Sequence, residues 1–226
     1  MKENFQEQTK IKNNTNLTMS DLEPNKSVNV EKEMLKQEGG YEIFFTKDPK
    51  YLDQYYELRH QAYVEDNGWA NYDGKRNKFD QMGHIVVTTK NDAVVGGLRL
   101  SFSSDFEYLS NEIPGTQYDY HKFISKYDST PNLLISEISA VVLEKSNRNT
   151  IATQAMLELA LKKSIQKGCH YSFAVSVITA ARYYRTLLRN IGHDLEILIN
   201  FPWERKGMFN FDRMFLMYTN LKKSKN

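Results

Sequence analysis

Cysteine is nearly absent from this sequence, with Cys169 as the single one among 226 residues. One cysteine cannot form an intramolecular disulfide, which excludes the disulfide-stapled scaffolds of small secreted proteins and fits a reducing compartment. Long apolar runs are also missing, since no stretch approaches the roughly 18 residues that a membrane-spanning helix needs. The first residues, MKENFQEQTKIK, lack the apolar segment of a secretory signal. We therefore expect a cytoplasmic protein without a membrane span.

An excess of charge of one sign is missing as well. Lys and Arg number 30 against 28 Asp and Glu, for a net charge of +2. This balance gives no general attraction for nucleic acid, so we expect no nucleic-acid partner and only local patches for charged partners. The five His lack metal-site spacing, and no Walker A, GxGxxG or GxSxG motif occurs. We expect no metal, no tightly bound cofactor and no covalent intermediate.

The first 40 residues are polar, and their few apolar residues are scattered. Such a composition buries too little apolar surface to offset the entropy lost on ordering. We therefore predict a disordered polar tail over residues 1–40, with a short helix over Val30–Glu38 as the alternative within it. Residues 41–226 contain no internal repeat or low-complexity linker, and they are predicted to form a single domain.

Apolar periodicity and capping signals place the elements of this domain. Strands are predicted at 41–47, 84–89, 93–100, 132–145, 170–177, 195–201 and 213–221. Helices are predicted at 48–68, 149–168 and 179–192. Consecutive strands imply hairpins, and the strand–helix–strand unit over 133–177 permits one parallel pair. The fold class is therefore α+β, with a mixed, mostly antiparallel central sheet flanked by helices.

Three charged residues interrupt apolar or aromatic surroundings: Arg59, Arg99 and Glu137. Arg99 lies in the strand pattern AVVGGLRLSFSS, and Glu137 shares its strand face with Ile135 and Val141. A buried carboxylate is costly unless it is paired or neutralised. Two interpretations remain open, an internal ion pair or sheet edge open to water, and a polar cleft floor where a carboxylate takes a proton from an amine.

Two further segments give weaker signals. GWANYDGKRNKFDQ combines Trp69 and Phe79 with Asp80, which suits a small cationic or amino ligand but equally a surface loop anchored by two aromatics. SNRNTIATQAML could bind an anion at a helix start, yet it lacks glycine and retains only Arg148, so an ordinary capped helix is favoured. The long insert over 103–132 is rich in aromatic residues, and inserts of this length are usually functional.

The blocks LRHQAYVEDNGW, NKFDQ, VVGGLRL and LLISEISAVVL resemble, in this order, those of the acyl-homoserine lactone (autoinducer) synthases and the related N-acyl amino acid synthases. Both belong to the GNAT acyltransferase superfamily. The resemblance spans residues 41–201. The matching residues are Arg59, Tyr63, Trp69, Phe79, Asp80, Arg99, Glu137 and Ser139. Two positions depart from the pattern, Asn77 for an acid and Ala140 for an arginine, and both count against S-adenosylmethionine as the acceptor.

The resemblance implies a GNAT-like fold and an N-acyltransferase that moves a fatty acyl group from an acyl carrier protein thioester to the amine of a small amino-acid-type acceptor. It implies Glu137 as the catalytic base, a backbone N–H of the central strand at the thioester carbonyl, and Tyr184 or Tyr183 near the leaving sulfur. Arg99 would line the acceptor pocket and hold a carboxylate or an acidic neighbour. The alternatives are a lactone synthase that uses S-adenosylmethionine, an acetyltransferase that uses coenzyme A, and a binding sensor without turnover.

An acidic carrier protein requires a local basic patch. Arg182, Arg185 and Arg189 recur at i, i+3 and i+7 and so share one helical face, with Arg148 as a further candidate. Lysines of the preceding helix add to these candidates: Lys162, Lys163 and Lys167. The alternative interpretation is a solvated basic face without a partner.

Overall fold

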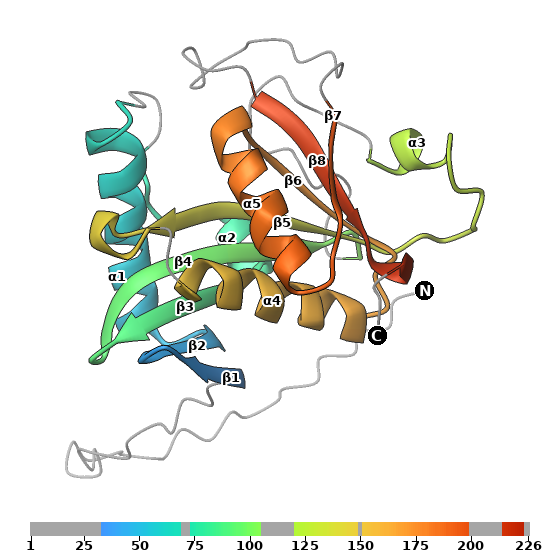
Figure 1. The fold of residues 1–226 in the computed structure, drawn as a ribbon. Coiled ribbons are helices and arrows are strands. Elements are labelled where there is room, and N and C mark those ends of the chain that lie inside the picture. The colour runs from blue at the N-terminus through green and yellow to red at the C-terminus, as the bar shows by residue number, and fades with distance from the viewer. Residues whose placement is uncertain (1–32, 69–72, 105–119, 149–150, 199–213, 224–226) are drawn as a thin grey trace, which may run out of the picture.

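The computed structural model describes residues 33–68, 73–104, 120–148, 151–198 and 214–223. Within them, strands form one mixed eight-stranded sheet with the order β1-β2-β3-β4-β5-β6-β8-β7 (Figure 1). The strands are β1 (Glu33–Glu38), β2 (Tyr41–Thr46), β3 (His84–Lys90), β4 (Ala93–Phe102), β5 (Ile135–Leu143), β6 (Tyr171–Val177), β7 (Leu195–Leu198) and β8 (Met214–Asn220). The helices are α1 (Pro49–His60), α2 (Lys78–Met82), α3 (Tyr120–Ile124), α4 (Ile151–Gln166) and α5 (Ile178–Asn190).

Every neighbouring pair of strands is antiparallel except β5 and β6, which run parallel. The helix α4 connects these two strands, as parallel pairing requires a crossover. The predicted α+β class and the mixed, mostly antiparallel sheet are therefore confirmed. The predicted first helix is confirmed from its cap, because the Asp48 side chain accepts from the Lys50 N–H at 2.9 Å and Pro49 follows it. The helix ends at His60 and continues as a π-helical turn over Gln61–Glu65.

The first strand corrects the prediction for the end of the polar tail. Glu33–Glu38 is a β-strand and not a helix, and it pairs antiparallel with β2 across a turn in which Gly39 and Gly40 adopt φ values of 58° and 80°. Lys36 and the Glu158 carboxylate of α4 lie 2.5 Å apart, and Lys163 of α4 pairs with Glu33. Strand pairing with β2 and ion pairs with α4 thus order a segment that, from its polar composition, was predicted to be disordered. The rest of the predicted tail lies outside the described residues.

The helices cover the two faces of the sheet in separate groups. One core joins α4 and α5 to the sheet, with Met156, Leu161 and Leu188 among its buried residues. On the opposite face, α1 packs on β2 and β3 in a second core, and α3 packs on β5, β6 and β8 in a third. Figure 1 shows α4 and α5 in front of the sheet and α1 beyond its strands. The predicted aromatic insert thus contributes a helix, α3, to the second face.

The strand β5 is irregular near its middle: its register with β4 shifts by one residue, and its pairing with β6 ends there. Its register with β4 runs from Gly97↔Val142 to Arg99↔Ser139, so β5 contains one extra residue at this point. Such an extra residue is a β-bulge, which bends the strand and redirects its backbone. Ala140 lies in the bulge with φ of 50°, a value that is uncommon outside glycine. Pairing between β5 and β6 covers only Ile135–Glu137 and Tyr171–Phe173, so the two strands separate beyond Glu137.

Candidate active site

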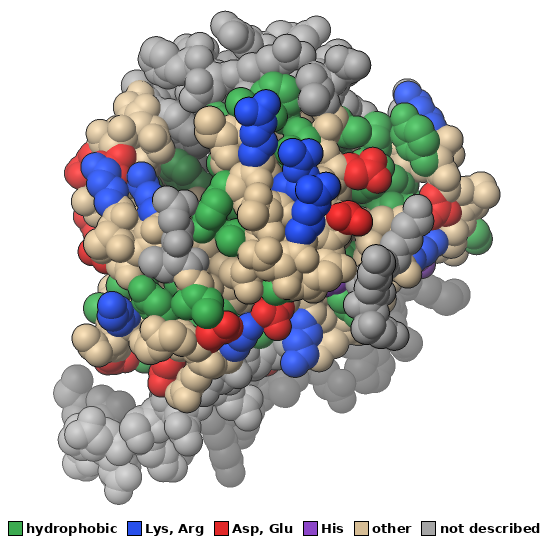
Figure 2. Space-filling view, viewed as in Figure 1, with side chains coloured by type: hydrophobic (Ala, Val, Ile, Leu, Met, Phe, Trp, Pro, Cys, Tyr) green, Lys and Arg blue, Asp and Glu red, His purple; other side chains and the backbone are tan. Residues whose placement is uncertain are grey.

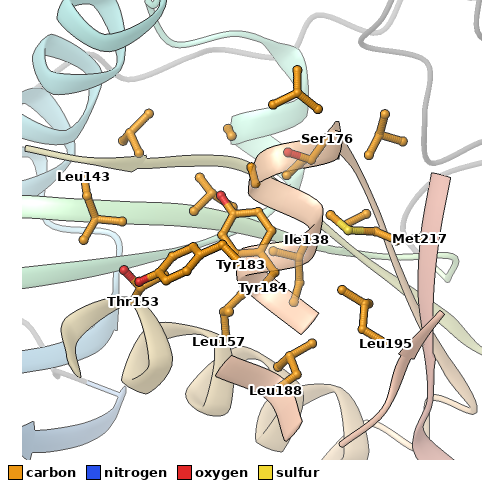
Figure 3. A pocket seen from close by; sticks show the side chains of 18 of the residues that line it. Ile138, Leu143, Thr153, Leu157, Ser176, Tyr183, Tyr184, Leu188, Leu195 and Met217 are labelled. Atoms are coloured by element: carbon orange, nitrogen blue, oxygen red, sulfur yellow. The ribbon is translucent and has the colours of Figure 1, made fainter. Parts of the chain in front are cut away.

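A cavity of about 490 Å³ opens where β5 and β6 separate (Figure 3). Its walls are residues 138–143 of β5 and residues 172–177 of β6. One end is lined by Tyr63, Asn67 and Arg148, and the other end lies under α4, α5, β7 and β8. The residues at that second, inner end are mostly apolar: Leu157, Leu161, Leu188, Leu195, Met214 and Met217. The cavity therefore joins a polar mouth to an apolar channel.

Two tyrosines of the α1 face hold the bulge of β5. The Tyr55 hydroxyl donates to the Ala140 carbonyl at 2.8 Å, and the Tyr63 hydroxyl donates to the Val141 carbonyl at 3.0 Å. Tyr55 reaches this position because Gly97 lies under its ring, where an added Cβ would come within 2.6 Å of Tyr55 Cδ2. The ring of Tyr55 thus packs directly on the backbone at Gly97. The two bonds fix the carbonyls of the bulge beside the cavity.

A cluster of buried charges lies on the same face as α1. Asp80 is in α2, and its carboxylate accepts from both terminal nitrogens of Arg59 at 2.8 Å and from Arg99 Nη1 at 3.2 Å. The side chains of all three residues are at most 2% exposed. Arg59 also donates to the Gly74 carbonyl at 2.8 Å and to the Lys75 carbonyl. Arg59 and Arg99 therefore form a buried ion pair whose shared acid is Asp80, whereas the sequence had offered these two arginines as partners for the Glu137 carboxylate.

Ser139 connects this cluster to the cavity. Arg99 donates to the Ser139 hydroxyl from Nε at 3.1 Å and from Nη2 at 2.9 Å, and Ser139 also lines the cavity. Burial raises the pKa of Asp80, but the hydrogen bonds and charge of Arg59, with the charge of Arg99, outweigh it and lower that pKa below 3.8. Asp80 is thus held ionised between two guanidinium groups. Ser139, which accepts hydrogen bonds from Arg99, places a polar side chain bonded to this cluster in the cavity wall.

Asn77, one of the two departures from the family pattern, caps α2. Its side chain accepts from the Phe79 N–H at 3.0 Å and the Asp80 N–H at 3.2 Å, while Asp80 Oδ2 accepts from the Asn77 N–H at 2.9 Å. This is a reciprocal capping box. The amide therefore orients Asp80 toward the two arginines.

Glu137 is buried, with 8% of its surface exposed, on the face of the sheet that α3 covers. Its carboxylate accepts from the Tyr120 hydroxyl at 2.9 Å, and the Tyr120 ring stacks on Phe173 with centroids 4.4 Å apart. The predicted burial of this acid is confirmed. It does not line the cavity, although its neighbour Ile138 does. Tyr120 was missed from the sequence, where only the abundance of aromatics in the insert signalled it.

Two of the three aromatic candidates, Phe79 and Tyr63, lie in the described part of the chain. The Phe79 ring lies with its centroid 5.6 Å from Arg99 Cζ, next to the charged cluster. Trp69 lies outside the described residues. Tyr63 lines the mouth of the cavity and anchors the bulge, as described above. Phe79 and Tyr63 therefore flank the predicted substrate region from α2 and from the π-helical turn that follows α1.

Tyr183 and Tyr184 of α5 both line the cavity (Figure 3). Burial raises the pKa of Tyr184 to about 12, with a smaller effect of Tyr183 in the same direction, and Arg148 opposes both. The Tyr183 hydroxyl is buried without a hydrogen-bond partner in the part of the chain that the structure describes. Tyr184 therefore stays protonated at neutral pH, in the state that can donate a proton.

Three of the predicted docking arginines lie on α5, and the fourth, Arg148, lies at the cavity. Arg182 and Arg189 on α5 are exposed and Arg185 is half-buried, with Arg189 Nε 3.5 Å from the Asp194 carboxylate. Figure 2 shows Lys and Arg side chains gathered over α5. Arg148 is exposed at the mouth of the cavity, 3.6 Å from Asp66. These arginines are thus close to the cavity, while Lys163 of α4 is engaged with Glu33.

The described residues contain neither a cluster of metal ligands nor a membrane-spanning helix. No group of three or more His, Cys, Asp or Glu in the described residues is arranged to hold a metal ion. No helix in the described part of the chain combines the length and hydropathy of a membrane span.

The architecture places the chain in a known fold class. No protein-family model and no curated protein sequence matches it. Solved structures do match. The N-acyl amino acid synthase FeeM from uncultured soil microbes gives a TM-score of 0.60 at 9% identity, covering 81% of this chain and 92% of its own. A candidate N-acetyltransferase from Lactobacillus plantarum gives 0.55 at 17% identity, covering 80% and 99%. The lactone synthase LasI gives 0.52 at 16% identity, covering 80% and 89%.

The chain therefore has the GNAT-like acyltransferase fold. Within that class, its fold is similar to those of an N-acyl amino acid synthase and of acyl-homoserine lactone synthases. The fold predicted from the four sequence blocks is confirmed.

Proposed function

We propose that this protein is an N-acyltransferase that moves a fatty acyl group from an acyl carrier protein thioester to the amine of a small amino-acid-type acceptor. The observation that carries the proposal is the cavity at the separation of β5 and β6. Its inner end is mostly apolar, and Ser139 in its wall bonds to Arg99 of the charged cluster. One site thus offers an acyl channel and a polar acceptor region side by side.

The channel favours a fatty acyl group over an acetyl group. Leu157, Leu161 and Leu188 extend along α4 and α5 beside the cavity. Burying each methylene of an acyl chain there contributes about 0.8 kcal/mol. An acetyl group would leave this apolar length unfilled, which counts against the acetyltransferase alternative.

The bulge of β5 supplies the position for the thioester carbonyl. The carbonyls of Ala140 and Val141 are held by Tyr55 and Tyr63, so the backbone of the bulge is fixed beside the cavity. Backbone N–H groups that are fixed in this way stabilise the oxyanion of an acyl-transfer intermediate. We assign this role to a backbone N–H of the bulge.

In the proposed reaction, the amine nitrogen attacks the thioester carbon, the C–N bond forms and the C–S bond breaks. The amine gives up a proton, which Glu137 takes through water because its carboxylate does not line the cavity, and Tyr184 donates a proton to the leaving thiolate. Tyr120 orients the Glu137 carboxylate. The acceptor would bind near Ser139, Phe79 and Arg99, whose acidic neighbour is Asp80.

The acceptor is proposed to be an amino acid and not S-adenosylmethionine. The resemblance to lactone synthases includes an acid at position 77 and an arginine at position 140. Here Asn77 caps α2, and Ala140 lines the cavity with a methyl group. The two charges that shape the S-adenosylmethionine pocket in that family are thus replaced by neutral side chains.

The donor is proposed to be an acyl carrier protein because the arginines of α5 form a basic surface next to the cavity, complementary to an acidic carrier. The test is incubation of the purified protein with decanoyl carrier protein, or with decanoyl-coenzyme A, and a mixture of amino acids. Mass spectrometry of the products identifies both donor and acceptor. An N-decanoyl amino acid supports the proposal. A lactone that forms only with S-adenosylmethionine, or acyl binding without any product, overturns it.

A further inference from the structure

The inner end of the cavity carries hydroxyl groups where a plain acyl chain would need only apolar contacts. Ser172 of β6 lines the cavity and is 4% exposed, and its Oγ has no hydrogen-bond partner in the described part of the chain. Thr219 of β8 is the register partner of Ser172, lines the same cavity and is 1% exposed. The apolar channel therefore ends on a polar row across two strands.

The orientation of Ser172 follows from its neighbours in the strand. Phe173 packs with Tyr120 on the face covered by α3, whereas Ala174 packs against the core under α4 and α5. Side chains alternate along a strand, so Ser172 points to the same side as Ala174. Leu161 and Leu195 lie on that side and complete the cavity wall.

Buried hydroxyls without a partner are rare in native proteins, because the hydrogen bonds to water that they lose on folding are not replaced by bonds within the protein. Alanine and valine would fill the same positions at no such cost if the channel took only hydrocarbon. We propose that the acyl group carried by this protein bears an oxygen function, a hydroxyl or keto group, near its far end, and that Ser172 hydrogen-bonds to it with Thr219 beside it. This inference rests on the proposed function, which assigns the acyl chain to this cavity.

The register sets the length of chain that reaches Ser172. Ser172 pairs with Ser136, which is four residues from Ala140 in the bulge. At about 3.3 Å per residue this separation is about 13 Å, within reach of a medium-length acyl chain whose thioester lies at the bulge. Ser136 itself is fully buried and without a partner among the described residues, yet it lies outside the cavity. It therefore provides a matched control.

The experiment is a competition between two donors on the same carrier, decanoyl and 10-hydroxydecanoyl, at equal concentration, with the product ratio read by mass spectrometry. The pairs with eight and twelve carbons are tested in the same way. For the wild-type protein we expect at least a tenfold preference for the oxidised chain at one of these lengths, about 1.4 kcal/mol. Ser172→Ala should bring the ratio close to one, because the hydroxyl loses its partner. Ser136→Ala, which removes a hydroxyl outside the cavity, should keep the wild-type ratio.

A second readout separates this inference from the proposed function. The melting temperature is measured with free 10-hydroxydecanoic acid and with decanoic acid, without donor or acceptor. A larger rise with the hydroxy acid in the wild-type protein, lost in Ser172→Ala, supports the inference even if no donor gives a product, in which case only the proposed function fails. A ratio of hydroxylated to plain product close to one at every chain length overturns the inference. Equal melting temperatures with the two free acids also overturn it.

Discussion

Arg59 and Asp80 form a bidentate ion pair closed to solvent, with both nitrogen–oxygen distances at 2.8 Å and both side chains fully buried. Arg59 uses two further N–H groups on the carbonyls of Gly74 and Lys75. Gly74 can approach because it lacks a side chain, since an added Cβ would lie 2.3 Å from the Cα of His60. The pair thus fixes α2 against α1 and places Asp80 in contact with Arg99.

Replacing Asp80 should destabilise the fold strongly. Asp80→Asn leaves Arg59 and Arg99 buried without their shared anion. Removing one partner of a buried ion pair typically costs about 3–5 kcal/mol of unfolding free energy. Urea unfolding at neutral pH measures the loss. As a control, Asp92→Asn removes an exposed partner of Lys50 and should change stability little, because exposed pairs contribute little. Equal small effects of both variants would contradict the structural role of the cluster.

The same cluster should contribute to how the unfolding free energy depends on pH in the acid range. The pKa of Asp80 is lowered from 3.8 in the folded protein. Between the folded pKa and 3.8 the unfolded chain binds more protons, so the contribution of Asp80 is complete above pH 3.8 and is lost as the pH falls through the folded pKa. Unfolding free energies measured from pH 6 downward should fall more steeply below pH 4 for the wild type than for Asp80→Asn. Parallel curves would show that another group controls this range.

Glu137 should be needed for the reaction more than for the fold. Glu137→Gln keeps the shape and the acceptor oxygen for Tyr120 but removes the proton acceptor. We expect the acyl-transfer rate to fall at least tenfold, about 1.4 kcal/mol of transition-state stabilisation, with an unchanged melting temperature. Tyr120→Phe keeps the stacking on Phe173 and removes the hydrogen bond, so a smaller decrease is expected. A Glu137→Gln variant with wild-type turnover would remove this residue from the role of base.

Tyr184 should act on the leaving thiol. Tyr184→Phe removes the proton donor, so the rate should fall for a carrier or coenzyme A thioester and recover for an activated thioester whose thiol leaves without protonation. Because the pKa of Tyr184 is about 12, the wild-type rate should show no loss of this donor as the pH passes 10.0, the ordinary value for tyrosine. Tyr183→Phe, on the adjacent position of α5, is the matched control. Equal decreases with both thioesters would assign Tyr184 a packing role.

The arginines of α5 should matter only for a carrier-bound donor. Reversing Arg185 and Arg189 to Glu should weaken use of acyl carrier protein and leave a short thioester mimic unaffected, because only the carrier needs docking. Added salt should slow the wild-type reaction with the carrier, since exposed charges are screened beyond roughly 8–10 Å at physiological ionic strength. Reversal of Lys47 and Lys126 to Glu, two exposed lysines outside the helices and strands, makes the same change of net charge. Equal losses with both donors would show that the arginines support the fold or the pocket.

Local patterns were sufficient for most elements and for the burial of the charged residues. The cap at Asp48 and the alternation around Arg99 and Glu137 are properties of neighbouring residues, so they can be recognised in sequence. The partner of each charge could not be recognised in this way, because Asp80 is 21 residues from Arg59 and 19 from Arg99. Tyr120, which bonds Glu137, lies in an insert without a regular pattern.

Only the tertiary structure decided two further features, the first strand and the cavity on which the proposed chemistry depends. The first strand forms because β2 and α4 offer pairing and counter-charges to Glu33–Glu38, a segment whose polar composition by itself predicts a tail. The cavity forms because a bulge at Ala140 diverts β5 from β6, and the partners that hold the bulge, Tyr55 and Tyr63, come from a helix on the far side of the sheet. Strand periodicity specifies which side chains are buried. Where two strands separate depends on what packs against both of them, and that is a property of the folded chain.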